Sequence, residues 1–184
     1  LLAQAFGFIA MIAGVVGIYF MICIYRIKAR PFWNHWQVAT AFSGSLISLG
    51  AVLISIVSIP ALAMQGESWS SLASLLGISI ISGLTIEGVG LFFHAKYLNN
   101  ETSEGAASHY IQKTTFGKTY RLRNALIAFN IIAMGSLVIT AHLATNGVQF
   151  LIIGAVRALL ALSIIFTTLI GRALFYVIVI PKKM

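Results

Sequence analysis

The sequence predicts an all-α protein, a polytopic bundle of transmembrane helices. Of its 184 residues, 59% are hydrophobic and only 9% are charged, whereas about a quarter of the residues in a soluble domain are charged. Five apolar runs each reach the length of about 20 residues that a helix needs to cross a bilayer core. Lys and Arg are concentrated in the segments between alternate runs.

The five predicted spans cover roughly residues 2–25, 38–64, 72–93, 124–145 and 148–180. None of them shows the alternation of apolar and polar residues that is typical of a membrane β-barrel strand. Residues 1–184 are therefore interpreted as a single transmembrane domain with one long loop at 94–123. The first run has no basic segment and no cleavage pattern before it, so we expect the sequence to be incomplete at its amino terminus.

The loop charges predict an orientation. The first loop (26–37), the long loop (94–123) and the tail all contain basic residues, whereas the second and fourth loops contain none. The basic residues of the first loop, the long loop and the tail are Arg26, Lys28, Arg30, Lys96, Lys113, Lys118, Arg121, Arg123, Lys182 and Lys183. Five spans place these three segments on one side. The positive-inside rule then puts them, and the carboxyl terminus, in the cytoplasm.

Two further patterns concern how the helices are placed. Tryptophans lie next to the ends of spans, as expected for an aromatic belt at the membrane interface: Trp33, Trp36 and Trp69. Small residues recur at every fourth position of the second span, a spacing that lets helices approach closely: Thr40, Gly44 and Ser48.

Several classes of protein are excluded. The net charge of +8 lies in loops that set orientation, so nucleic-acid binding is a poor interpretation. Cys23 is the only cysteine, which rules out a disulfide framework, an iron-sulfur site or a thiolate zinc site made by this chain alone. His94 and His142 lie near opposite ends of their spans, so we expect no haem and no metal in this chain. His35 and His109 fall in loops and are expected to be solvated.

Glu87 is the only acidic residue within a predicted span. Gly83, Gly88 and Gly90 surround it, so a neighbouring helix is expected to pack against it. His94, seven residues later, returns to nearly the same helix face. A buried carboxyl and a buried imidazole can both titrate near neutral pH, so the pair predicts either a proton path toward the interface or a polar contact that holds two helices together.

Arg157 and Arg172 both lie within the last apolar run. Their separation of 15 residues corresponds to about 22 Å of helix, less than the bilayer core of about 30 Å. One perpendicular helix therefore cannot place both backbones outside the core. Either both side chains snorkel to the interfaces, or Arg172 is deep and paired. One side of the helix carries both arginines together with Thr168 and Tyr176, and this side is expected to be turned to protein. Its role is either to pack the helix or to form a polar site.

Three segments resemble a known family. The ending GRALFYVIVIPKKM is similar to the carboxyl-terminal signature of the dimethyl sulfoxide reductase anchor subunits, the DmsC-like membrane subunits. IYRIKARPFWNHW (24–36) and QKTTFGKTYRLRN (112–124) resemble that family's basic loops, and the three occur in family order. The resemblance implies eight spans, of which the five seen here would be the last, and an anchor without haem.

The resemblance also implies a function in the prokaryotic cytoplasmic (inner) membrane. Such an anchor binds quinol or quinone, menaquinone or ubiquinone, and exchanges electrons with an iron-sulfur subunit that serves a molybdopterin catalytic subunit. A quinone site needs hydrogen-bond donors, a proton acceptor and an apolar slot. The candidates are Arg172 and Tyr176 as donors, Glu87 and His94 as proton acceptors, and Tyr25, Arg26 and Trp33 at the pocket entrance or partner surface.

Two alternatives remain at this stage. The first is a subunit of a transporter or channel, in which Glu87 and Arg157 would form a gated ion pair; the paired broken helices that are typical of transporters are not found in the sequence. The second is a structural anchor whose complex binds quinone elsewhere. Under the leading hypothesis the chain is a non-catalytic or quinol-oxidising subunit of an oxidoreductase complex.

Overall fold

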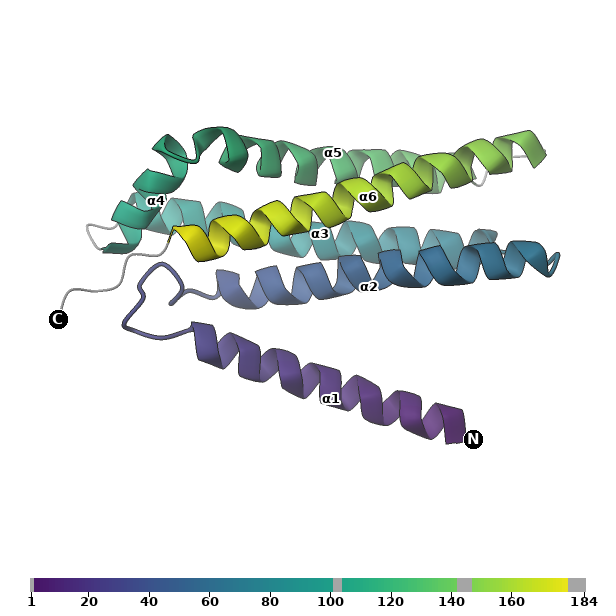
Figure 1. Cartoon of the computed structure of the whole chain (residues 1–184), viewed down its shortest axis with the longest axis horizontal. Coiled ribbons are helices and arrows are strands. Elements are labelled where there is room, and N and C mark those ends of the chain that lie inside the picture. The colour runs from purple at the N-terminus through teal and green to yellow at the C-terminus, as the bar shows by residue number, and fades with distance from the viewer. Residues whose placement is uncertain (1, 101–103, 142–146, 179–184) are drawn as a thin grey trace.

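The computed structural model describes residues 2–100, 104–141 and 147–178, which form six helices and no strand (Figure 1). The helices are α1 (Leu2–Tyr25), α2 (Gln37–Met64), α3 (Ser70–Asn99), α4 (Glu104–Thr114), α5 (Gly117–Ala141) and α6 (Gly147–Val177). All except the short α4 contain a segment that is long and apolar enough to cross a membrane. The predicted all-α bundle with five spans is confirmed.

Most of the segment that was predicted as a long loop is helical. α3 continues to Asn99, α5 begins at Gly117, and α4 lies between them and packs against both. One face of α4 is buried at helical spacing, and it consists of Gly105, Ser108, His109 and Gln112. The segment was predicted as a loop because it is polar, whereas an amphipathic helix of three turns needs only a few residues on its buried face. Residues 101–103 lie outside the described part.

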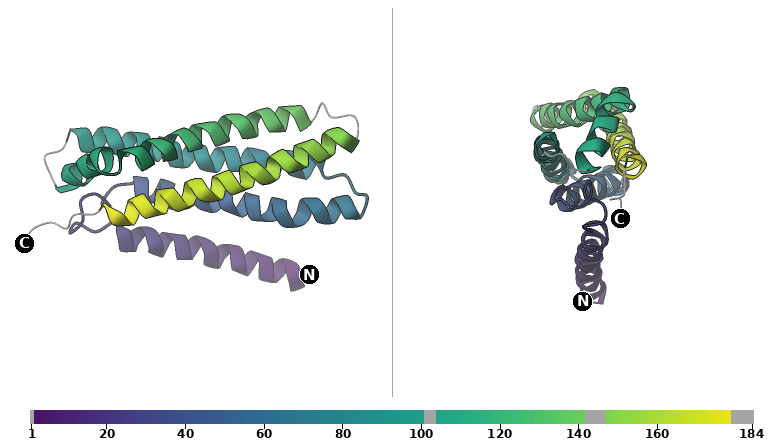
Figure 2. Two further views of the ribbon diagram at one scale, coloured as in Figure 1. Left: turned by 45° about the horizontal axis from the view of Figure 1, so that its top comes forward. Right: turned by 90° about the vertical axis from the view of Figure 1, so that its left-hand side faces the viewer.

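The structure has a bundle of four helices and one helix that stands apart. Figure 2 shows α2, α3, α5 and α6 packed together, with α1 diverging from α2 toward the amino terminus. No residue of α1 is buried, although Tyr25 at its end packs against a buried cluster that contains Trp33 and Phe175. The described core therefore lies within the four-helix bundle and between this bundle and the first loop.

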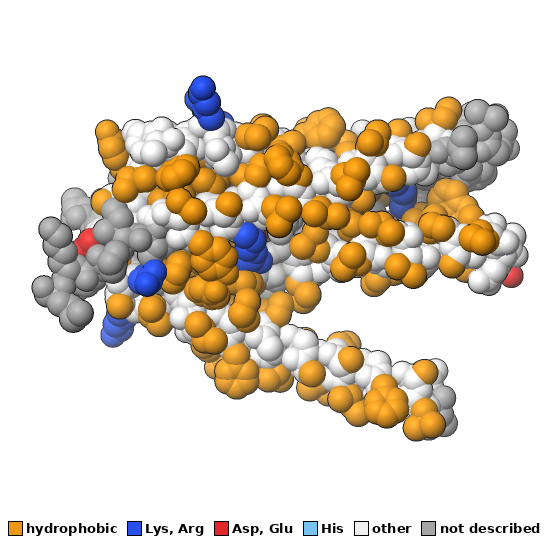
Figure 3. All heavy atoms as spheres, viewed as in Figure 1, with side chains coloured by type: hydrophobic (Ala, Val, Ile, Leu, Met, Phe, Trp, Pro, Cys, Tyr) orange, Lys and Arg blue, Asp and Glu red, His pale blue; other side chains and the backbone are white. Residues whose placement is uncertain are grey.

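Basic side chains gather at one end of the bundle. The first loop, α4 and the end of α6 lie together at what we call the α4 end, and the α2–α3 loop with Trp69 lies at the opposite, Trp69 end (Figure 1). Figure 3 shows apolar side chains along the helices and most of the visible Lys and Arg toward the α4 end. The predicted grouping of the first two basic segments is thus observed; Lys182 and Lys183 of the tail lie outside the described residues.

Glycines bring α2 and α3 into backbone contact. A Cβ atom placed on Gly83 would lie 2.6 Å from the carbonyl oxygen of Gly44, and one placed on Gly90 would overlap the side chain of Thr40. Gly88, by contrast, faces only Ile127 at an ordinary distance of 3.6 Å. The close approach that the small residues of α2 predicted is confirmed, and it holds Glu87 against the backbone of α2.

The substitution Gly83→Ala is expected to lower the stability of the bundle by about 1–3 kcal/mol, because overpacking must separate two backbones that touch. The matched control is Gly50→Ala, since a Cβ on Gly50 meets nothing within 4 Å. Thermal unfolding of the purified protein in detergent measures the difference. Equal melting temperatures for the two variants would contradict the α2–α3 contact.

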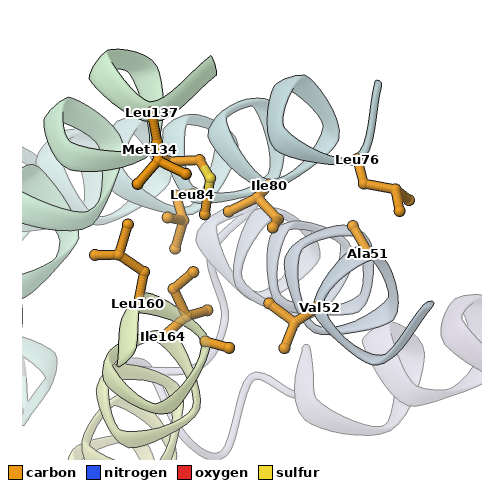
Figure 4. Packing of buried hydrophobic residues seen from close by; sticks show 10 residues of the cluster. Ala51, Val52, Leu76, Ile80, Leu84, Met134, Leu137, Leu160 and Ile164 are labelled. Carbon is orange, nitrogen blue, oxygen red and sulfur yellow. The ribbon is translucent and has the colours of Figure 1, made fainter. Parts of the chain in front are cut away.

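An apolar core fills the middle of the bundle. Side chains from α2, α3, α5 and α6 meet there, among them Val52, Leu84, Met134 and Ile164 (Figure 4). Toward the α4 end, the buried Asn130 Nδ2 of α5 donates a hydrogen bond of 3.1 Å to Thr167 Oγ1 of α6. This core separates a polar pocket at the α4 end from a second cavity at the Trp69 end.

Candidate functional site

A polar pocket lies at the α4 end, where α2, α3, α4, α5 and α6 converge. Its volume is about 30 Å³, which is room for about two water molecules and too little for a quinone ring. Charged and polar side chains from all five helices line it: Gln37, Glu87, His94, His109, Gln112, Arg123 and Arg172. The bundle thus encloses a cluster of ionisable groups at its α4 end.

Glu87 lies on the face of α3 that meets α2, and only 7% of its surface is exposed. Its carboxylate interacts electrostatically with Arg123 of α5 and Arg172 of α6. Within the described part of the chain, neither guanidinium closes an ion pair with it. The expectation that Glu87 faces protein is met, and its carboxylate is held near two positive charges without being neutralised by a direct contact.

Two histidines complete the acid–base cluster. His94 lies seven residues after Glu87 on α3 and lines the same pocket. His109 Nδ1 lies 3.1 Å from Gln112 Oε1; because an amide oxygen only accepts, Nδ1 carries the hydrogen and Nε2 is an acceptor. Nε2 of both histidines is buried without a partner among the described residues. Such atoms usually bind ordered water, for which the pocket has room.

The expectation of a solvated side chain is wrong for His109 and is met only in part for His35. His109 is buried because α4 folds over the pocket, and burial lowers the pKa of its imidazole, which favours the neutral ring. His35 is half-buried and stacks on His94, with ring centres 4.9 Å apart. Burial, and in second place the charge of Arg26, lowers the pKa of His35. His142 lies outside the described residues.

Arg172 connects the pocket to the side of the bundle. Its Nη2 donates a hydrogen bond of 2.6 Å to Ser45 Oγ, and its guanidinium lies 4.0 Å above the ring of Phe42. Gly171 adjoins the carboxyl group, since a Cβ there would be in ordinary contact with Glu87 Oε1, at 3.5 Å. Arg172 thus has partners within the bundle, as the deep and paired alternative requires.

Tyr176 lies outside the pocket. Its side chain is 48% exposed, so the expectation that this helix face is wholly turned to protein is wrong at its last turn. A hydrogen bond of 2.9 Å joins its hydroxyl to that of Tyr25, whose ring stacks on Phe42. We call Tyr25, Phe42 and Tyr176 the aromatic edge; it lies beside Arg172 and between α1, α2 and α6.

Trp33 anchors the first loop to α6. Its Nε1 donates a hydrogen bond of 3.0 Å to the carbonyl oxygen of Phe175, and their rings stack at 5.2 Å. Only 8% of Trp33 is exposed, so its ring faces protein and not lipid, unlike a residue of an interfacial belt. The loop folds back because Trp33 buries its ring against α6 and Arg30 covers it from outside, 4.7 Å away. Arg26 is exposed and does not line the pocket.

Arg123 is the main pocket residue that the candidate list omitted. The sequence predicted a loop charge here, but Arg123 is a buried residue of α5. Its Nη2 donates a hydrogen bond of 2.7 Å to Asn124 Oδ1, and its guanidinium lies over the ring of Tyr120. The helical spacing of the residues that follow it was the available signal. The buried face of α5 continues at Ile127, Asn130, Met134 and Leu137.

Two further points concern the partner of Arg157 and the grouping of possible metal ligands. Arg157 Nη1 donates a hydrogen bond of 2.8 Å to the carbonyl oxygen of Ala73, which lies about 21 Å along α3 from Glu87. The ion pair that the transporter alternative required is therefore contradicted. Within the described ranges, no three side chains of His, Cys, Asp or Glu are grouped to hold a metal ion.

The fold and site define a class: a polytopic helical membrane protein with a buried acid–base cluster at one end of its bundle. Residues 1–178 match the family described as DMSO reductase anchor subunit (DmsC), so the chain belongs to that family, and the resemblance of its loops and ending is confirmed. Neither a curated protein nor a solved structure matches the chain. Family membership assigns the protein to the multi-pass membrane anchor subunits of DMSO reductase-type complexes.

Proposed function

We propose that this anchor oxidises quinol, or reduces quinone in the reverse direction, for a molybdopterin oxidoreductase complex in a prokaryotic cytoplasmic membrane. Electrons pass to an iron-sulfur subunit and from there to the molybdopterin subunit. The observation that carries the proposal is the position of Arg172, which lines the pocket beside Glu87 and also contacts Phe42 of the aromatic edge. A hydrogen-bond donor and a proton acceptor thus adjoin a lipid-facing surface.

The quinone ring is assigned to the aromatic edge because the inner pocket has room only for water. Tyr176 presents an exposed ring there, and the half-buried Tyr25 holds its hydroxyl group against that of Tyr176. The Tyr176 hydroxyl and the Arg172 guanidinium supply hydrogen-bond donors for a quinone oxygen, while the isoprenoid tail of menaquinone or ubiquinone remains in the hydrocarbon. This arrangement needs no movement of the helices that enclose Glu87.

Glu87 is assigned as the first proton acceptor. Oxidation of one quinol releases two electrons, which go to the iron-sulfur subunit, and two protons, which must leave the membrane. The carboxylate accepts a proton next to Arg172, and water in the pocket connects it with the free Nε2 atoms of His94 and His109. Since α4 covers the pocket at the end of the bundle, this route leaves past α4, whose buried face carries His109.

The α4 end is proposed as the docking surface for the iron-sulfur subunit. It combines the proton exit with the basic residues of the first loop, of which Arg26 and Lys28 are exposed and Arg30 is half-buried. The distribution of charge supports a cytoplasmic position for this end and for the carboxyl terminus.

The subunits that co-purify with the chain test the proposed function. A complex isolated from native membranes is expected to contain molybdenum and iron-sulfur clusters, and its oxidation of a quinol analogue is expected to be blocked by quinone-like inhibitors. Metal analysis, electron paramagnetic resonance and inhibitor titration measure these properties. A complex that lacks both molybdenum and iron would refute the proposal, and so would quinol oxidation that no quinone analogue inhibits.

A further inference from the structure

A second cavity lies at the Trp69 end, between the last turns of α2 and the first part of α6. Its volume is about 650 Å³, and it lies on the far side of the apolar core from Glu87. Figure 1 shows α2 and α6 diverging toward this end. Apolar side chains such as Ile56, Ile59 and Ala161 form most of its wall, and Trp69 stands at its margin. Nothing in the proposed quinol chemistry uses this cavity.

Among the described residues that line the cavity, Arg157 is the one that carries a charge. The residue is only 9% exposed, and its Nη1 donates to the carbonyl oxygen of Ala73. Its Nε and Nη2 are buried and have no hydrogen-bond partner among the described residues. No described carboxylate lines the cavity. Since Arg stays protonated in proteins and a buried charge favours a nearby counter-charge, the chemistry of Arg157 suits an anionic ligand.

We propose that this cavity binds an anionic phospholipid, with its phosphate on Arg157 and an acyl chain along α2 and α6. A phosphate offers two oxygens to the parallel N–H donors of a guanidinium and neutralises its charge. A neutral headgroup, such as a quinone carbonyl, would satisfy a donor but leave the charge uncompensated. Trp69 suits this position, because tryptophan rings favour the depth of the lipid headgroups.

The acyl-chain part of the site can be blocked without disturbing the bundle. Gly154 lines the cavity, and a Cβ atom there would meet nothing within 4 Å. The substitution Gly154→Leu therefore extends a side chain into open space. Gly135 of α5 has equally free surroundings but does not line the cavity, so Gly135→Leu is the matched control.

The test is native mass spectrometry of the whole complex in mild detergent, with phosphatidylglycerol as the probe. We expect the wild type and Gly135→Leu to retain this lipid. The amount bound to Arg157→Gln and to Gly154→Leu is expected to be at least about tenfold lower. Arg157→Gln removes the charge-assisted hydrogen bonds to the phosphate, and Gly154→Leu fills the space for the acyl chain. After delipidation, vesicles of phosphatidylglycerol are expected to raise the melting temperature of the wild type more than vesicles of phosphatidylcholine do.

Two results would overturn the proposal. One is equal retention of phosphatidylglycerol by the wild type, Arg157→Gln and Gly154→Leu. The other is a bound neutral lipid or quinone in place of the anionic lipid in the wild type. If Arg157→Gln fails to fold, the comparison of Gly154→Leu with Gly135→Leu still decides the matter.

Discussion

Replacing Glu87 by Gln is expected to slow quinol oxidation by the intact complex about 10²- to 10⁴-fold, the usual contribution of a positioned general base. Glutamine keeps the size and polarity of the side chain but cannot accept the proton. The rate at which a quinol analogue reduces the iron-sulfur clusters, followed by stopped-flow absorbance, measures the effect. The result is specific to proton transfer if the variant still assembles with its full content of iron and molybdenum.

Glu67→Gln is the matched control for this substitution. Glu67 is exposed in the α2–α3 loop at the Trp69 end, far from the polar pocket, and its variant is expected to oxidise quinol at the wild-type rate. An unchanged rate in Glu87→Gln would remove Glu87 from the proton route and leave it a role in packing α3 against α2.

Replacing Arg172 by Gln is expected to weaken quinol binding about 10- to 150-fold, because a hydrogen bond from a charged donor contributes about 1.5–3 kcal/mol. The loss should appear mainly in KM and in the Kd of a quinone-like inhibitor. Arg172→Lys keeps the charge but not the planar fork that contacts both Ser45 and the ring of Phe42, so an intermediate loss is expected. Steady-state kinetics and inhibitor titration separate the two variants.

Arg121→Gln serves as the control, because Arg121 is an exposed residue of α5 at the same end of the bundle and does not line the pocket. If Arg172→Gln lowers the melting temperature but leaves both KM and inhibitor binding at wild-type values, Arg172 only holds α6 against α2. That outcome would reject its role as a quinone ligand.

Much of the fold is determined by the sequence alone. A bilayer core offers no water to unpaired backbone groups, so a long apolar run without alternation must become a helix. All five predicted spans follow from this requirement, with ends that shift where α3 and α5 extend into the predicted loop. The common face of Glu87 and His94 was also predictable, since seven residues make nearly two turns of a helix.

The composition of the pocket could not be predicted in full, because it depends on how helices rotate against one another. Arg123 and His109 come from segments that read as a polar loop, and only the folding of α4 and α5 over α3 buries them. Tyr176 was expected to face protein with Arg172, yet it lies on the aromatic edge. Helix rotation is set by contacts such as Gly44 with Gly83, which join segments far apart in the chain.

The two arginines of α6 also show what the sequence determines and what the tertiary structure decides. Their spacing along one helix was enough to show that both backbones cannot lie outside a perpendicular bilayer core. What each guanidinium meets was decided by the tertiary structure, because the neighbours belong to other helices: Ser45 of α2 for Arg172, 127 residues away in sequence, and Ala73 of α3 for Arg157. A sequence specifies which charges must be buried, and packing specifies their partners.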